Sequence, residues 1–153
     1  MSPRSAVHGS FVIERSYPAS PARVFKAFAD EKAKAKWFGP GVEPHERAFD
    51  FRVGGAEVFV GKHPSGMVSA FYCTYQDIVP NERIVYAYRM SLDGVPISIS
   101  LATIEIKPEG QGTHLTVTEY GVFIDGYEDK GSREHGTNWL MDLLGKSLED
   151  DPV

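Results

Sequence analysis

Hydrophobic and polar residues alternate with a period of two over most of the chain between residues 42 and 120. This period is typical of half-buried strands. Clusters of Gly, Pro, Asn and Asp interrupt it and predict tight turns, so neighbouring strands pair antiparallel. The pattern predicts about six to seven strands. The strand-like segments are residues 11–17, 42–53, 56–61, 68–79, 83–90, 96–107 and 113–120.

A helical period appears after the first strand. Ser20 followed by Pro21 is a helix start, because the serine oxygen caps free amides and proline needs no donor in the first turn. A second short helix is predicted from Asp30, with Ala33 and Trp37 on one face, up to the glycines and proline at residues 39–41.

The end of the chain predicts one long amphipathic helix, with Ser132 as its N-cap. A helix with one apolar face must cover a sheet, so the fold class is α+β, a curved antiparallel sheet packed on a C-terminal helix. The residues expected on the apolar stripe are Gly136, Trp139, Leu140, Leu143, Leu144 and Leu148.

Length and composition indicate one domain. The 153 residues are 42% hydrophobic and 12% aromatic, which suits a single core over residues 11–150 behind a flexible lead-in at residues 1–10. A net charge of −5 without a dense basic run argues against nucleic acid or an anionic membrane surface as partner. The absence of an export signal or a long apolar run predicts a cytoplasmic protein without membrane insertion.

Reactive side chains give little sign of a catalytic or metal centre. The five histidines share no helix face, and Cys73, the single cysteine, reads as a core residue of a strand. Nucleotide-binding loops and nucleophile elbows are missing as well, so we predict no metal, no cofactor and no assigned catalytic residue.

Glu119 is the most informative polar residue. It alternates with Leu115 and Val117 and therefore faces either the sheet interior or, at the strand end, solvent. A buried carboxylate needs a companion, for which Arg89 or a tyrosine hydroxyl is the candidate.

Aromatic residues are the candidate walls of a pocket between sheet and helix. Tyr86 and Tyr88 share one strand face, and a tyrosine there offers a ring and a phenolic donor to an amphipathic ligand. The same rings could instead fill the core. The predicted ligand contacts are Tyr86, Tyr88, Glu119, Trp139, Leu143, Phe49, Phe59 and Trp37.

Several motifs, taken in order, resemble the START-like (SRPBCC) superfamily, in the branch similar to the Aha-type activator of the Hsp-90 ATPase. They are Pro18-Ala-Ser-Pro-Ala-Arg-Val-Phe25, Lys36-Trp-Phe-Gly-Pro40, Phe49-Asp-Phe-Arg-Val-Gly-Gly55, Ile78-Val-Pro-Asn-Glu-Arg-Ile-Val-Tyr86, Gly112-Thr-His-Leu-Thr-Val-Thr118 and Arg133-Glu-His-Gly-Thr137. The resemblance implies a helix-grip fold with two short helices after the first strand and a cavity for a small apolar or amphipathic molecule.

Three functions follow as hypotheses. The first is binding of that small molecule without catalysis. The second is a cyclase, aromatase or hydrolase, favoured if Glu119, Arg89, His114 or a tyrosine converges on the cavity. The third is a chaperone partner or other interaction module, which predicts a filled core and an exposed patch, either across the edge strand or on the apolar strand with Ile97, Ile99 and Leu101. That apolar strand could instead support a homodimer.

Overall fold

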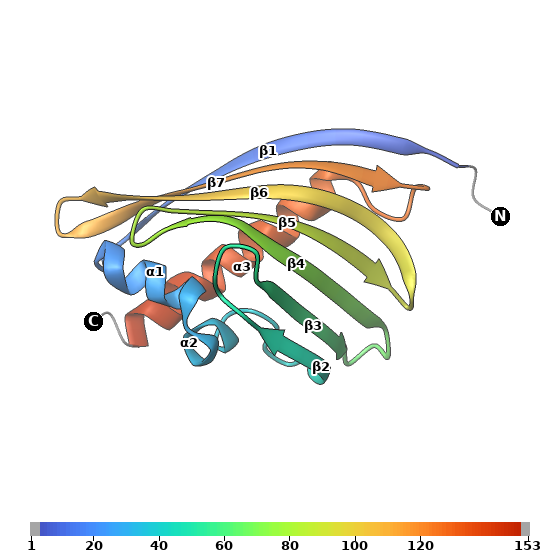
Figure 1. Cartoon of the computed structure of the whole chain (residues 1–153), viewed down its shortest axis with the longest axis horizontal. Coiled ribbons are helices and arrows are strands. Elements are labelled where there is room, and N and C mark those ends of the chain that lie inside the picture. The colour runs from blue at the N-terminus through green and yellow to red at the C-terminus, as the bar shows by residue number, and fades with distance from the viewer. Residues whose placement is uncertain (1–3, 151–153) are drawn as a thin grey trace.

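A curved antiparallel sheet wraps around one long helix in the computed structural model, which describes residues 4–150 (Figure 1). The predicted helix-grip fold is confirmed, including the two short helices after the first strand. In chain order the elements are β1 (Ala6–Tyr17), α1 (Pro21–Ala29), α2 (Glu31–Ala35), β2 (Glu43–Phe49), β3 (Ala56–Lys62), β4 (Val68–Val79), β5 (Arg83–Leu92), β6 (Val95–Glu109), β7 (Gly112–Ile124) and α3 (Lys130–Asp150).

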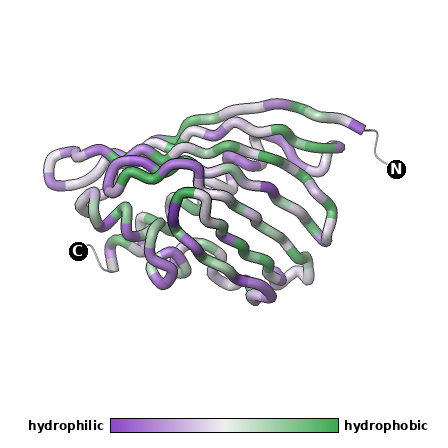
Figure 2. The backbone as a smooth tube through the Cα atoms, in the orientation of Figure 1, coloured by the Kyte–Doolittle hydropathy of each residue, from purple (hydrophilic) through white to green (hydrophobic). Residues whose placement is uncertain are grey.

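The strand order is β1-β7-β6-β5-β4-β3-β2, and every neighbouring pair is antiparallel. Strands β2 to β7 follow one another through turns, as the spacing of turn residues predicts. Strand β1 pairs with β7 because α1 and α2 carry the chain across to the far edge of the sheet. Apolar and polar residues alternate along the strands (Figure 2), so one face packs on α3 and the other faces solvent.

The first strand is longer than predicted. Strand β1 begins at Ala6, and residues 6–10 pair in register with residues 120–124 of β7. Those residues therefore belong to the sheet and not to a lead-in, while residues 1–3 of the predicted lead-in lie outside the described part. The pattern concealed this because His8, Gly9 and Ser10 carry little apolar signal.

The predicted hairpin strand through Val53 is shorter. Strand β2 ends at Phe49, and residues 50–55 form the connection. The backbone of Gly54 and Gly55 bonds instead to Tyr75 of β4, at 2.8 and 3.0 Å. Glycine is required at position 55, because a Cβ there would lie 2.1 Å from the carbonyl oxygen of Asp50.

The two early helices begin as predicted. The Ser20 hydroxyl accepts a hydrogen bond from the Arg23 amide at 3.1 Å, and the Asp30 carboxylate accepts one from Ala33 at 2.9 Å. Trp37 then packs into the core, and its indole N–H donates to the carbonyl of Ala27 at 2.9 Å. This bond ties the segment after α2 to α1.

Helix α3 differs from its prediction in its cap and its buried stripe. Asp129, not Ser132, supplies the cap, because its carboxylate accepts from the Ser132 amide at 2.8 Å. Trp139 has 53% of its surface exposed, so its expected place on the buried stripe is wrong. The residues buried against the sheet are Arg133, Thr137, Met141, Leu144, Ser147 and Leu148.

Candidate functional site

A cavity of about 330 Å³ opens between the middle of α3, the segment joining α2 to β2, and the turn between β3 and β4. Its volume is at the lower end of the range for small-molecule sites, about 300 to 1,000 Å³. The residues that line it are Phe38, Gly39, Pro40, Gly41, Val42, Phe59, His63, Pro64, Ser69, Phe71, Met90, Trp139 and Leu140.

The lining is apolar except at one place. His63 Nε2 lies 2.7 Å from the Ser69 hydroxyl oxygen, and this pair forms the hydrogen-bonding end of the cavity. Phe59 and Phe71 are buried, whereas Trp139 is half exposed. A ligand with an apolar body and one polar group matches this distribution.

The segment after α2 is shaped by one aromatic residue and one glycine. The ring of Phe38 packs edge-on against Phe71, with centroids 5.0 Å apart, and against Phe59 at 5.9 Å. Gly39 has a φ of +84°, and a Cβ there would lie 2.5 Å from the Phe59 ring. Glycine at this position therefore lets the chain turn tightly over the aromatic wall.

The structure separates the predicted ligand contacts. Phe59 and Trp139 line the cavity, whereas Tyr86 and Leu143 pack against the core. The other four lie in the core or in two buried polar clusters, and none is among the lining residues: Trp37, Phe49, Tyr88 and Glu119. Sequence reasoning missed Phe38, Val42, His63, Ser69, Phe71 and Met90 as cavity residues.

Glu119 and Tyr88 form the first buried polar cluster with Arg133. The Tyr88 hydroxyl donates to the Glu119 carboxylate at 2.5 Å, and Arg133 donates to the Tyr88 oxygen at 3.0 Å. Arg133 also bonds to Ser98 at 2.7 Å and pairs with Glu128. The inward direction of Glu119 and a tyrosine companion are thus confirmed, and the solvent-facing alternative is wrong.

The basic companion of Glu119 is Arg133 and not Arg89. Arg89 lies on the opposite face of the sheet, with its guanidinium 4.7 Å from the Tyr72 ring centroid. His114 pairs with Glu14 and Glu109 near the turn that joins β6 to β7. The residues whose convergence on the cavity would favour an enzyme are therefore absent from its lining.

Burial raises the pKa of Glu119 above its ordinary value of 4.5, although the Tyr88 hydrogen bond and the charge of Arg133 lower it. The folded state then holds this proton more tightly than the unfolded state, so the free energy of unfolding falls as pH rises from about 4.5 through the higher folded pKa. Because Glu119→Gln cannot ionise, we expect its stability relative to the natural protein to improve over that interval. Urea unfolding at several pH values measures this difference.

The exposed Glu46 provides the matched control. Glu46→Gln should follow the pH dependence of the natural protein. A Glu119→Gln curve that stays parallel to the natural one at every pH would show that the buried carboxyl makes no such contribution.

A second buried cluster joins Lys34 of α2 to Glu57 of β3. The Lys34 ammonium donates to the Glu57 carboxylate at 2.5 Å, and the Tyr75 hydroxyl donates to the same oxygen at 2.5 Å. The ammonium nitrogen also lies within 6.0 Å of four ring centroids, at 4.6 Å for the nearest. Rings attract a cation at this range and so add to the attraction of the Glu57 carboxylate. The four rings belong to Trp37, Phe38, Phe49 and Phe71.

The thiol of Cys73 is unreactive because it is buried. Cys73 is buried in β4, as predicted for a core residue, and burial raises the pKa of its thiol to about 12. Such a thiol is a poor nucleophile.

Among residues 4–150, His, Cys, Asp and Glu side chains do not gather in threes as a metal site would require. None of the helices in this part is both long and apolar enough to cross a bilayer.

The fold and sequence have close matches among solved structures. A protein from Rhizobium loti is 46% identical, over 94% of this chain and 99% of that one, with a TM-score of 0.88. One from Rhizobium leguminosarum is 41% identical, over 98% and 100%, with a TM-score of 0.92. One from Chromobacterium violaceum is 28% identical, over 90% and 94%, with a TM-score of 0.76.

Comparison with curated proteins gives no match. The family model described as "Activator of Hsp90 ATPase homolog 1-like protein" matches residues 18–149. This agrees with the START-like resemblance of the sequence motifs. The chain belongs to the Activator of Hsp90 ATPase homolog 1-like family.

Proposed function

We propose that this protein binds a small apolar or amphipathic molecule in the cavity between α3 and the sheet. The cavity itself carries the proposal, because its aromatic walls and its one polar end at His63 and Ser69 are the features of a ligand site. The apolar body of the ligand would contact Phe59, Phe71 and Leu140, while its polar group would bond at the His63 end.

The cavity volume narrows the ligand class. At about 330 Å³, the cavity is close to the lower limit of the range for small-molecule sites, about 300 to 1,000 Å³. A medium-chain fatty acid or a one-ring to two-ring aromatic compound fits that space better than a sterol does.

Ligand binding should raise the melting temperature. A ligand present at 100 times its Kd adds about 2.7 kcal/mol to the free energy of unfolding when it binds only the folded state. Thermal-shift measurements with fatty acids, flavonoids, polyketide-like aromatics and sterols would find the class, and native mass spectrometry of freshly purified protein would detect a retained adduct. Leu140→Trp should abolish both signals, because the indole would occupy the cavity.

The control substitution is Val53→Trp, which adds the same indole at an exposed position of the loop after β2. It should leave the shift and the adduct intact. A shift that persists in Leu140→Trp would place the ligand elsewhere, and the absence of any shift or adduct across all four classes would count against the function.

Partnership with an Hsp90-type chaperone is the second candidate, and the description of the family is the observation that favours it. Its test is the rate of ATP hydrolysis by a purified Hsp90-type chaperone with and without this protein. Faster hydrolysis combined with no response to any ligand would favour this candidate over the first.

A further inference from the structure

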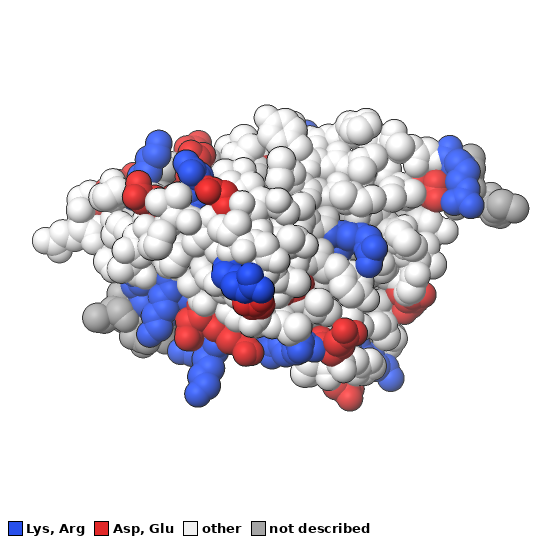
Figure 3. Space-filling view, in the orientation of Figure 1, with Lys and Arg blue, Asp and Glu red and all other residues white. Residues whose placement is uncertain are grey.

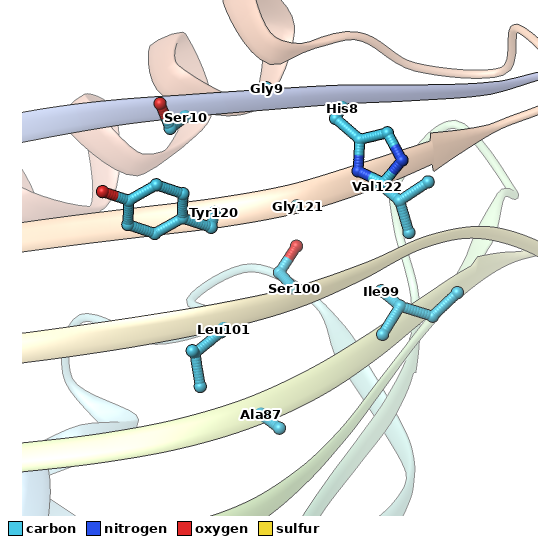
Figure 4. Close-up of a pocket in the computed structure, with 10 residues that line it drawn as sticks. All are labelled: His8, Gly9, Ser10, Ala87, Ile99, Ser100, Leu101, Tyr120, Gly121 and Val122. Carbon is cyan, nitrogen blue, oxygen red and sulfur yellow. The ribbon is translucent and has the colours of Figure 1, made fainter.

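The solvent face of the sheet carries a group of exposed apolar side chains. The exposed fractions are 57% for Val12, 45% for Ile99, 45% for Leu101 and 62% for Tyr120. Figure 4 shows Ile99, Leu101, Tyr120 and Val122 standing on one side of β6 and β7. We call Val12, Ala87, Ile99, Leu101, Tyr120 and Val122 the outer patch. Ile97, predicted to join them, is buried instead, because it is the extra residue of a bulge opposite Met90 and Ser91.

Two shallow hollows on this face meet at the centre of the outer patch. One of about 580 Å³ lies over β1, β7 and β6, and the other of about 410 Å³ lies over β3, β4 and β5. Both are lined by Ala87 and Ile99, so they form one continuous trough across the sheet. The floor of the first hollow is backbone at Gly9 and Gly121, and the Tyr120 ring rises beside it (Figure 4).

The patch has the size of an interface centre. Three strand spacings of about 4.8 Å separate β1 from β5, and three outward side chains along a strand span about 14 Å. The projected area is then roughly 200 Å², before the relief of the side chains is added. Monomers rarely expose a contiguous apolar patch larger than a few hundred Å². Polar residues Ser10, Thr74, Thr103 and Thr118 border the patch on neighbouring strand positions, and an apolar centre with a polar rim is the usual composition of a protein interface.

The scarcity of charged side chains on this face favours a second copy of the chain as the partner. The chain has a net charge of −5, so two copies repel one another unless they meet through a surface without excess charge. Figure 3 shows few charged residues over the middle of this face. Arg89 lines the second hollow and carries the one fixed charge among the residues that line either hollow, and its guanidinium is already placed over the Tyr72 ring. A strongly acidic or basic partner would find almost no oppositely charged side chain on this face for an ion pair. A second copy of the same face would meet little like charge and would therefore not be repelled.

We propose that the outer patch is the interface of a two-fold symmetric homodimer, in which the two sheets stack face to face. Packed sheets lie about 10 Å apart with strands crossing at about 30°, and a two-fold axis brings the same patch together from both copies. The Tyr120 ring of one copy would enter the hollow over Gly9 and Gly121 of the other. This inference is independent of the ligand cavity, which lies on the opposite face of the sheet.

Sedimentation velocity over a range of protein concentrations tests the interface. The natural protein should sediment with twice the mass of its 16.9 kDa chain. Leu101→Asp should weaken the dimer at least about 100-fold, because each two-fold contact would bury two unpaired carboxylates. Val53→Asp, an equally apolar and exposed position in the loop after β2, should leave the dimer unchanged.

Circular dichroism of Leu101→Asp would confirm that the half-exposed substitution leaves the fold intact. Tyr120→Asp is the second interface variant and should act in the same direction. A natural protein that remains a 16.9 kDa monomer at about 500 µM, well above the Kd of common specific complexes, would overturn the proposal. A dimer that survives both substitutions would also overturn it, because its contact would then lie elsewhere.

Discussion

Replacing Lys34 by Met should lower the free energy of unfolding by about 3 to 5 kcal/mol. The substitution removes the ammonium but leaves the Glu57 carboxylate buried, with the Tyr75 hydroxyl as its remaining partner in the cluster. A buried carboxylate without a counter-charge is costly because water no longer solvates it. Urea unfolding at neutral pH measures the loss.

Two further variants separate charge burial from simple loss of contacts. Adding Glu57→Gln to Lys34→Met should restore most of the lost stability, because a neutral amide still accepts from Tyr75. Arg52→Met breaks an ion pair with Asp50 in which the two side chains are 68% and 51% exposed, and it should cost less than about 1 kcal/mol. A loss below about 1 kcal/mol for Lys34→Met, similar to the surface pair, would contradict the account of the buried cluster.

Arg133→Met should have the second largest effect, about 3 kcal/mol, because hydrogen bonds from a buried charged group are each worth roughly 1.5 to 3 kcal/mol. Arg133 joins the first turns of α3 to Tyr88 of β5 and Ser98 of β6. It also lowers the pKa of Glu119 by its charge, so the variant should raise that pKa further. Hydrogen exchange should become faster in residues 130–137 before it changes at the other end of the helix.

Arg15→Met is the matched control, since Arg15 also anchors α3. It bonds to Asn138 at 2.9 Å and to Asp142 at 3.1 Å, but the Asp142 side chain is 66% exposed. This variant should cost at most about 1 kcal/mol. If Arg15→Met and Arg133→Met destabilise equally, burial is not what gives Arg133 its importance.

Strand β1 and strands β3 to β7 were predictable because each one buries a single face, whereas β2 at the sheet edge buries none. Alternation located β4 at its observed bounds, and it offered the inner face of β7 as one of two positions for Glu119, which the structure buries. Helix α3 was harder, because Arg133 and Thr137 occupy its buried side. Both side chains are buried because they form hydrogen bonds, and the partners of Arg133 lie more than thirty positions away in the sequence. A prediction based on apolar residues alone cannot detect such bonds, so it placed the buried stripe of the helix too close to Trp139.

The candidate site was less predictable, since loops supply much of it. Gly39 and His63 belong to no periodic segment, and their meeting depends on how the connections cross the sheet. The sequence did contain one indication of the buried cluster of Lys34, Glu57 and Tyr75. Glu57 alternates with Phe59 and Gly61 on β3, so an inward carboxylate there predicts a buried cation, although the pattern does not name Lys34.

The most direct test of the ligand cavity is an NMR measurement of intermolecular NOEs with the compound that gives the largest thermal shift. The account predicts NOEs from the ligand to the methyl groups of Val42, Met90 and Leu140, which line the cavity. NOEs to Ala87, Ile99 and Leu101 instead would place the ligand in the trough on the opposite face and would contradict the proposed function.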